Sequence, residues 1–274
     1  MIMKAVAIIT TLILMGLSFA THAEELDATS IITKVYETKR VEDQISTLTF
    51  TFFNPDKAEQ RVVYTMVWKN MHGEDKFDNK AMFFTEFPPE KKGIAYLGWL
   101  RVMGSDAKDD EWIYLPELRM VRRIAHRDPN SSHDVDEFGN SILMREHLDP
   151  RPPDLDRHEL MDEQELDGRM HYVIASTPEQ QNANQISKII YWIDKQNFRT
   201  SRKQFFDQDN QLSLDMNISW TQLGDYWVWQ KVTAIDPRNQ AKTVLEIGDI
   251  KINSNLNDRL FSKKSLDKDP QRLH

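Results

Sequence analysis

The sequence predicts a mainly β protein: a strongly curved antiparallel sheet or incomplete barrel, with a few helices covering its open face. Many short segments alternate apolar and polar side chains, and short polar turns separate them. Several strands are apolar on both faces. In one of them Ile189, Tyr191 and Ile193 share one face, and Ile190 and Trp192 share the other. A sheet with one wet face lacks this pattern, so one face must pack on helices, a second sheet or an apolar ligand.

A helix is predicted before the first strand, over residues 24–42. Apolar side chains recur there at helical spacing: Ile31, Ile32, Val35 and Tyr36. Thr29 or Ser30 stands where an N-terminal cap is expected. This is the first of the helices expected over the open face.

From residue 47 the period of the apolar pattern changes to two. Leu48, Phe50 and Phe52 alternate with threonines, and residues 62–68 alternate in the same way. β-Branched and aromatic residues dominate these segments, as is typical of strands. Further strands are predicted over residues 81–86, 93–102, 111–115, 120–125, 170–176, 187–194, 199–206, 212–221, 227–235 and 242–252.

One of the turns resembles the start of a calcium-binding loop, with Asp207, Asp209 and Gln211 at the first positions. It lacks the glycine of such a loop, and Ile218 stands where the bidentate glutamate belongs. The sequence therefore predicts a β-hairpin turn at this point.

The strand pattern breaks over residues 126–153, which are mostly polar and lack periodicity. Long insertions in compact domains are usually lids or other functional segments, so a lid-like insertion on one face of the sheet is predicted. Residues 141–148 are expected to form a short helix within it. The acidic run over residues 154–167 is interpreted as a charged surface helix or loop.

The N-terminus has the pattern of a secretory signal. Lys4 precedes a mostly apolar run over residues 5–19, which is shorter than the ~20 residues that span a bilayer. Thr21 and Ala23 have the spacing of a cleavage site. The prediction is a signal peptide over residues 1–23 and a single domain over residues 24–274, and an uncleaved anchor is the weaker alternative.

Composition excludes several classes of function. The 274-residue chain contains no cysteine, which excludes disulfides, thiolate metal sites and a lipid-modified N-terminal cysteine. Its formal net charge of −8 argues against binding nucleic acid or anionic membrane surfaces. With the signal pattern, the predicted location is outside the cytoplasm.

No catalytic motif stands out, so the sequence predicts that the protein is not an enzyme and needs no cofactor. The histidines lack metal-ligand spacing, and there is no nucleophile elbow or glycine-rich phosphate loop. Residues 133–137 have the composition of a hard-metal site, but a solvated acidic loop explains them better, and no metal is expected.

The most specific segment is residues 111–124, EWIYLPELRMVRRI, in which one strand ends at a Leu-Pro turn and the next presents two arginines. It resembles a hairpin of the outer membrane lipoprotein-sorting protein family, relatives of the periplasmic carrier LolA. Other segments resemble the family in the same order: residues 87–99, 192–195, 205–207, 243–247 and 260–262. The chain departs from the family after this hairpin. Residues 138–143, FGNSIL, replace its usual segment, which puts in doubt a lid taken from relatives.

The resemblance implies a LolA/LolB-like half-barrel whose hollow takes acyl chains. Burial of each methylene group of such a chain contributes about 0.8 kcal/mol to the binding free energy. The side chains expected to line this hollow are Phe50, Phe52, Tyr64, Met66, Trp68, Leu97, Trp99, Trp112, Tyr114 and Trp192. The alternative for each of these residues is an ordinary place in the core.

Arg122 and Arg123 have two interpretations of similar weight. One of them binds a lipid headgroup or clamps the lid, or both form ion pairs with surface carboxylates. Because neighbouring strand residues face opposite ways, only one of the two can face the hollow.

The function predicted from the resemblance is that of a periplasmic carrier for lipid or acylated protein. The resemblance also implies a partner, an RND-type (MMPL-like) inner-membrane transporter. The alternative is an accessory or scaffold subunit of an envelope transport complex that uses the same fold without a lipid.

Overall fold

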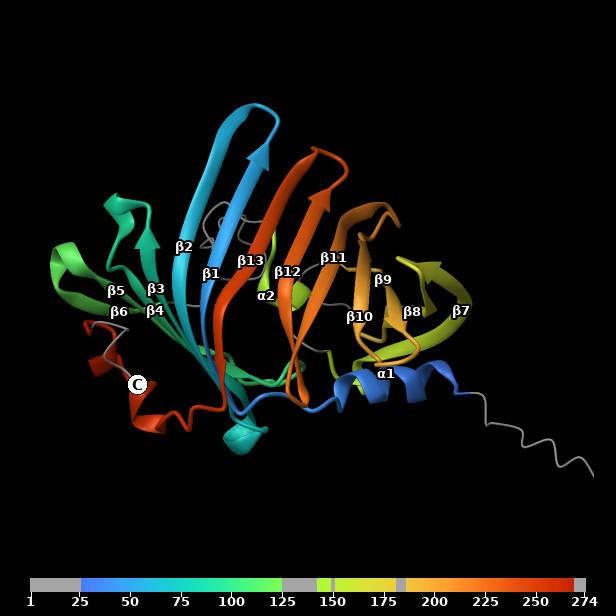
Figure 1. Ribbon diagram of the computed structural model, residues 1–274, viewed down its shortest axis with the longest axis horizontal. Helices are drawn as coiled ribbons and strands as arrows, with labels where there is room; N and C mark the ends of the chain where they lie inside the picture. Colours follow the sequence, from blue (N-terminus) through green and yellow to red (C-terminus); the bar gives the residue numbers. More distant parts are fainter. Residues whose placement is uncertain (1–25, 125–141, 149–150, 181–185, 269–274) are drawn as a thin grey trace, which may run out of the picture.

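A single antiparallel sheet dominates the computed structural model, which describes residues 26–124, 142–148, 151–180 and 186–268 (Figure 1). Thirteen strands of this described part are hydrogen-bonded in the order β6-β5-β4-β3-β2-β1-β13-β12-β11-β10-β9-β8-β7. The sheet is curved and does not close, because β6 and β7 remain as its two edges. The predicted mainly β half-barrel is thereby confirmed.

The first half of the sheet is a meander that grows outward from its centre. Its strands are β1 (Asp43–Asn54), β2 (Lys57–Asn70), β3 (Phe77–Phe87), β4 (Ala95–Arg101), β5 (Asp110–Leu115) and β6 (Met120–Arg123). The chain then passes to the opposite edge, and a second meander returns to pair β13 with β1.

The strands of this second meander are β7 (Asp156–Leu166), β8 (Arg169–Pro178), β9 (Lys188–Asp194), β10 (Thr200–Phe206), β11 (Leu212–Leu223), β12 (Tyr226–Asp236) and β13 (Ala241–Ile252). Every strand predicted from the sequence is present, although β2 and β3 begin earlier than expected.

Strand β7 corrects one prediction. The acidic run expected as a surface helix or loop is a strand, which pairs with β8 along its length. Its side chains are mostly exposed, so it lacks the apolar alternation that identifies a strand from sequence. Charged side chains on an edge strand also disfavour edge-to-edge association with another sheet.

Two short helices accompany the sheet, α1 (Ala28–Tyr36) and α2 (Arg145–Leu148). α1 is shorter than the predicted helix, and its cap is Asp27 rather than Thr29 or Ser30. The Asp27 carboxylate accepts a hydrogen bond from the Ser30 amide at 2.7 Å. α2 falls within the helix predicted in the insertion.

The face of the sheet that carries Phe50 and Tyr191, here called the inner face, holds the larger apolar cluster. Strand register places Phe50 opposite Val62 on β2 and Leu245 on β13, so one apolar row crosses the centre of the sheet. Both helices contribute to this cluster, which includes Ile31, Ile32 and the partly buried Leu148.

The opposite face, here called the outer face, carries a second cluster in the first half of the sheet. Leu97 and Trp112 pair across β4 and β5, and the segment that follows β13 packs onto them with Phe261 and Leu266. Both of these C-terminal side chains are only 1% exposed. This packing explains why strands of this half are apolar on both faces.

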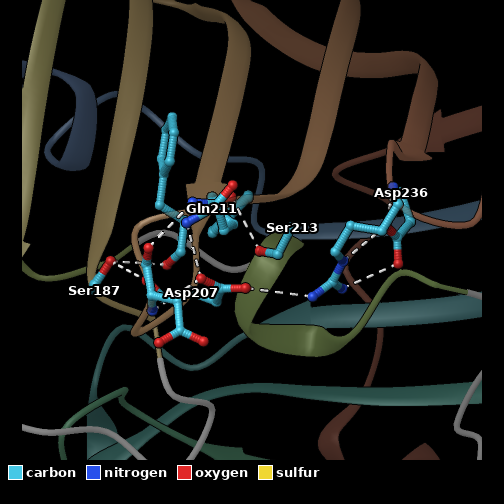
Figure 2. A network of polar contacts seen from close by, with 9 residues as sticks. Ser187, Asp207, Gln211, Ser213 and Asp236 are labelled. Atoms are coloured by element: carbon cyan, nitrogen blue, oxygen red, sulfur yellow. Dashed lines mark hydrogen bonds and ion pairs between the residues drawn. The ribbon is translucent and has the colours of Figure 1, made fainter.

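The turn between β10 and β11 confirms the predicted hairpin (Figure 2). The Asp207 carboxylate accepts hydrogen bonds from the backbone amides of Asp209 at 3.1 Å and Gln211 at 2.9 Å. Its other oxygen faces Arg238 at 3.5 Å, and Arg238 also pairs with Asp236 at 3.1 Å. Protein donors therefore engage both oxygens of the carboxylate that resembled a calcium ligand.

Three sequence-based predictions lie outside the described residues. They are the signal peptide over residues 1–23, the acidic loop over residues 133–137 and most of the insertion over residues 126–153. None of the helices in the described part has the length and apolar character needed to cross a bilayer.

Candidate lipid-binding cavity

A cavity of about 340 Å³ lies on the inner face. Volumes of this order are at the lower end of the range for small-ligand sites. The strands supply most of the apolar wall, and α1 and α2 add Val35 and Leu148. The large apolar and aromatic side chains that line the cavity from the sheet are Leu48, Phe50, Met66, Trp68, Phe83, Tyr96, Leu100, Ile218, Trp220, Trp227, Trp229, Leu245 and Ile247.

Five of the residues proposed from the sequence lie on this inner face. Phe50, Met66 and Trp68 line the cavity itself. Phe52 and Tyr64 pack around Phe50, with ring centroids 6.0 Å and 5.9 Å from its ring. The structure therefore groups these five side chains, three of them at the cavity wall.

The other five proposed lining residues lie on the outer face. Leu97, Trp99, Trp112 and Tyr114 belong to the outer cluster, and the Trp99 indole donates to the Phe261 carbonyl at 3.0 Å. Trp192 donates from its indole to Gln164 at 3.0 Å on β7. These side chains are separated from the cavity by the sheet itself.

Sequence reasoning missed several aromatic residues of the wall, notably Phe83, Tyr96, Trp220 and Trp229. Phe83 pairs with Met66 on one side and Tyr96 on the other, which gives one continuous inner row. Period-two alternation was visible in each strand, but it does not say which of the two sets faces inward. Only the register between strands assigns the face.

Register also separates the two arginines of β6. Arg123 lies opposite Trp112 and forms an ion pair with Asp110, so it belongs to the outer face. Arg122 lies opposite Ile113, which lies opposite Tyr96 of the cavity wall. Arg122 therefore shares the face of the cavity, although it is exposed at the edge of the sheet.

The charged side chains of the cavity wall are mostly cationic. Lys39, Arg40, Arg199 and Lys203 line it, and the one acidic side chain among the described lining residues is Asp78. The Asp78 carboxylate forms an ion pair with the Arg40 guanidinium at 2.9 Å. A positive lining is notable in a chain whose formal net charge is −8.

Arg199 has the least compensated charge of these four. Its Nε is buried and has no hydrogen-bond partner, and its guanidinium lies 5.2 Å from the ring centroid of Trp220. Burial lowers the pKa of Arg199 to about 10, which still leaves the group charged at neutral pH. Trp220 is itself held by a hydrogen bond from its indole to the Thr200 carbonyl at 2.9 Å.

A second, more polar pocket of about 240 Å³ adjoins the cavity. Arg199, Ile218, Trp220 and Trp227 line both spaces. The other residues of this second pocket include serine, asparagine and aspartate side chains. Arg199 thus belongs to the wall of both spaces.

The short helix α2 rests on the cavity wall. The Lys203 ammonium donates to the His147 carbonyl at 3.1 Å, and the His147 ring lies 4.7 Å from the ring of Phe205. Burial, together with the nearby Lys203 charge, lowers the pKa of His147 to about 4. His147 is therefore neutral at physiological pH, and its Nδ1 accepts from the Met144 amide at 3.1 Å.

Within the described segments, no three histidine, aspartate or glutamate side chains converge as metal ligands. The cavity wall is apolar and aromatic, with cations at one end. Such a wall provides burial and charge pairing rather than a set of metal ligands.

Comparison with known proteins supports the architecture. A family model described as "Uncharacterized protein" matches residues 77–268, which is more than half of the chain. No curated protein matches the sequence significantly.

Three solved structures share the fold. A DUF1329 family protein from Desulfovibrio piger has a TM-score of 0.74 and 21% identity, covering 87% of this chain and 97% of that one. A putative outer membrane lipoprotein-sorting protein domain from Vibrio parahaemolyticus has a TM-score of 0.73 and 20% identity, covering 88% and 98%. A LolA superfamily protein from Nitrosomonas europaea has a TM-score of 0.61 and 17% identity, covering 88% and 99%.

Proposed function

The chain belongs to a LolA-like family, and from that premise we propose that it is a periplasmic carrier that holds an acyl chain in its inner-face cavity. The cargo is a lipid or an acylated protein. The observation that carries the proposal is the aromatic-lined cavity, whose wall includes Phe50, Met66 and Trp68.

The physical argument starts from the cost of moving an acyl chain through water. Each methylene group buried in an apolar wall contributes about 0.8 kcal/mol, so a long chain supplies most of the affinity. Four of the seven tryptophans of the chain line this cavity: Trp68, Trp220, Trp227 and Trp229. Binding of this kind needs no covalent chemistry, which supports a carrier rather than an enzyme.

Export completes the proposal. The N-terminal pattern of Lys4, an apolar run and small residues before residue 24 supports cleavage of a signal peptide and release into the periplasm. The partner proposed for loading or unloading is an RND-type (MMPL-like) inner-membrane transporter, as the family resemblance implies. Arg122, on the inner face at the edge strand β6, is proposed to contact a headgroup or the covering segment.

A pair of neighbouring substitutions tests the cavity. Ile247 lines it from β13, whereas Glu246 lies on the outer face opposite Thr49. Ile247→Trp should fill part of the cavity and exclude about two methylene groups of a ligand. That loss corresponds to about 1.6 kcal/mol, or roughly tenfold in affinity. Glu246→Trp is the matched control and should bind as the wild type does. Displacement of a neutral fluorescent dye by palmitic acid measures both.

A second measurement asks what the protein holds in cells. Purified protein is extracted with organic solvent, and the extract is examined by mass spectrometry for acyl-chain ligands. If no such ligand co-purifies and palmitic acid displaces no dye, the carrier proposal is wrong. The scaffold or accessory role in an envelope complex would then be the better explanation of the fold.

A further inference from the structure

We propose that the ligand is an acidic single-chain amphiphile whose anionic headgroup pairs with Arg199 while its acyl chain lies in the apolar cavity. The inference rests on the proposed lipid-binding function and specifies the chemistry of the headgroup. The shared chemistry is a carboxylate or a phosphate oxoanion, carried by a fatty acid or by a lysophospholipid acid.

The position of Arg199 is the first argument. It stands where the apolar cavity meets the polar pocket, because both spaces include Arg199 and Trp220 in their walls. An amphiphile whose chain occupied the cavity would place its headgroup at this junction. The tail would then be buried, and the carboxylate or phosphate would lie beside the Arg199 guanidinium at the cavity wall.

The unmet charge of Arg199 is the second argument. Buried polar atoms are nearly always hydrogen-bonded, yet the Arg199 Nε has no partner. Burial is the one cause of its lowered pKa, with no carboxylate acting on it in the described part of the chain. Holding a guanidinium in this state costs stability, and an incoming oxoanion would supply the missing acceptor with two-point geometry.

The neighbouring charges favour the same assignment. Asp194 of the polar pocket is paired with Arg169 at 2.7 Å, and Asp167 of that pocket is exposed to solvent. In the cavity, Asp78 is paired with Arg40, and Lys203 already donates to the His147 carbonyl. Arg199 is thus the cation best placed to receive an acidic ligand.

The test compares ligands that differ only in the headgroup. Palmitic acid and its neutral alcohol, cetyl alcohol, compete with a neutral dye for the delipidated full-length mature protein. The acid should bind on the order of 10- to 100-fold more tightly than the alcohol, the range expected for a hydrogen-bonded charge pair. Arg199→Met should abolish this preference, so that the acid and the alcohol compete equally well in the variant. Arg61→Met removes an exposed outer-face charge and should retain the preference.

Arg199→Gln repeats the test if the methionine variant folds poorly. Palmitoyl lysophosphatidic acid and inorganic phosphate identify the source of the anion, and preferential binding of either acyl acid through Arg199 supports the inference. Phosphate binding alone, lost on Arg199→Met, overturns it in favour of a free-anion site. Two results overturn the inference and leave the carrier proposal standing. One is equal binding of the acid and the alcohol by the wild-type protein. The other is a preference for the acid that persists in both Arg199→Met and Arg199→Gln. If neither amphiphile binds, both proposals are wrong.

Discussion

At the scale of single residues, two ionisable side chains at or beside the cavity are wholly or partly buried, and burial disfavours their charged forms. Arg199 keeps a charge with an unpartnered Nε, and His147 is held neutral by burial at 9% exposure. Neither feature improves stability, because desolvation penalises the charged form of each group. Arg199 lies at the cavity wall, and His147 lies on α2 beside Lys203 of that wall.

His147 predicts a specific loss of stability in acid. Its native pKa is about 4, against 6.5 in the unfolded chain, so only the unfolded state takes up a proton between these values. The free energy of unfolding should therefore be fully retained above about pH 6.5 and fall as the pH drops toward 4. The loss is roughly 3 kcal/mol by linkage.

The measurement is urea unfolding of the wild type and His147→Gln across this pH range. Carboxylates titrate in both proteins, so the difference between the two curves isolates His147. Parallel curves between pH 6.5 and pH 4 would contradict the prediction.

At the scale of elements, the C-terminal segment after β13 protects the outer face. The buried Asp43 carboxylate accepts from the amides of Ser254 at 2.6 Å and Leu256 at 2.9 Å, which ties the start of the segment to β1. Lys69 then donates to the Leu256 carbonyl at 2.7 Å. These polar contacts position Phe261 and Leu266 over Trp112 and its neighbours.

Leu266→Ala should therefore destabilise the protein by about 3 kcal/mol, because it empties a fully enclosed site in the outer cluster. Leu118→Ala is the matched control, since Leu118 is 56% exposed and should lose less than about 0.5 kcal/mol. Chemical denaturation measures both. Lipid affinity should be the same in the two variants, because the sheet separates this cluster from the cavity. A Leu266→Ala protein as stable as the wild type would show that the segment does not cover the outer face.

At the scale of the whole molecule, the sheet has two apolar faces, and different parts of the chain pack against each of them. In the first half of the sheet the chain's own C-terminal segment covers the outer face, whereas α1 and α2 pack against the inner face, which retains a cavity. Pairing of β13 with β1 joins the two meanders at the centre of the sheet. Ligand binding to the inner face should therefore stabilise both halves together.

Palmitic acid at about a hundredfold excess over its Kd should raise the free energy of unfolding by about 2.7 kcal/mol. For a chain of this size that corresponds to a rise in Tm of roughly 5–10 °C. Differential scanning calorimetry measures the shift. Ile247→Trp should show about half this rise at the same ligand concentration, because a tenfold weaker Kd reduces the stabilisation to about 1.4 kcal/mol. An equal rise in both proteins would place the ligand outside the cavity.

Local patterns in the sequence identify the fold class and most of the strands, and the hairpin over residues 111–124 indicates the family. Alternation of apolar side chains is a local property, so strands such as residues 187–194 can be predicted from their own sequence. Prediction from apolar alternation failed at β7, because an edge strand with mostly exposed side chains lacks that alternation. It also failed at the cap of α1, where Asp27, Thr29 and Ser30 are chemically similar candidates.

Which of the two sets of side chains in each alternating strand faces the cavity depends on the three-dimensional arrangement of the sheet. Phe50 and Trp68 lie on the inner side and Trp112 and Trp192 on the outer side, although all four belong to similar apolar strands. Register between neighbouring strands sets this choice, and register depends on turns and bulges spread over the whole sheet. Arg199 could not be predicted as a site residue, because the lack of a hydrogen-bond partner for its Nε depends on its three-dimensional surroundings.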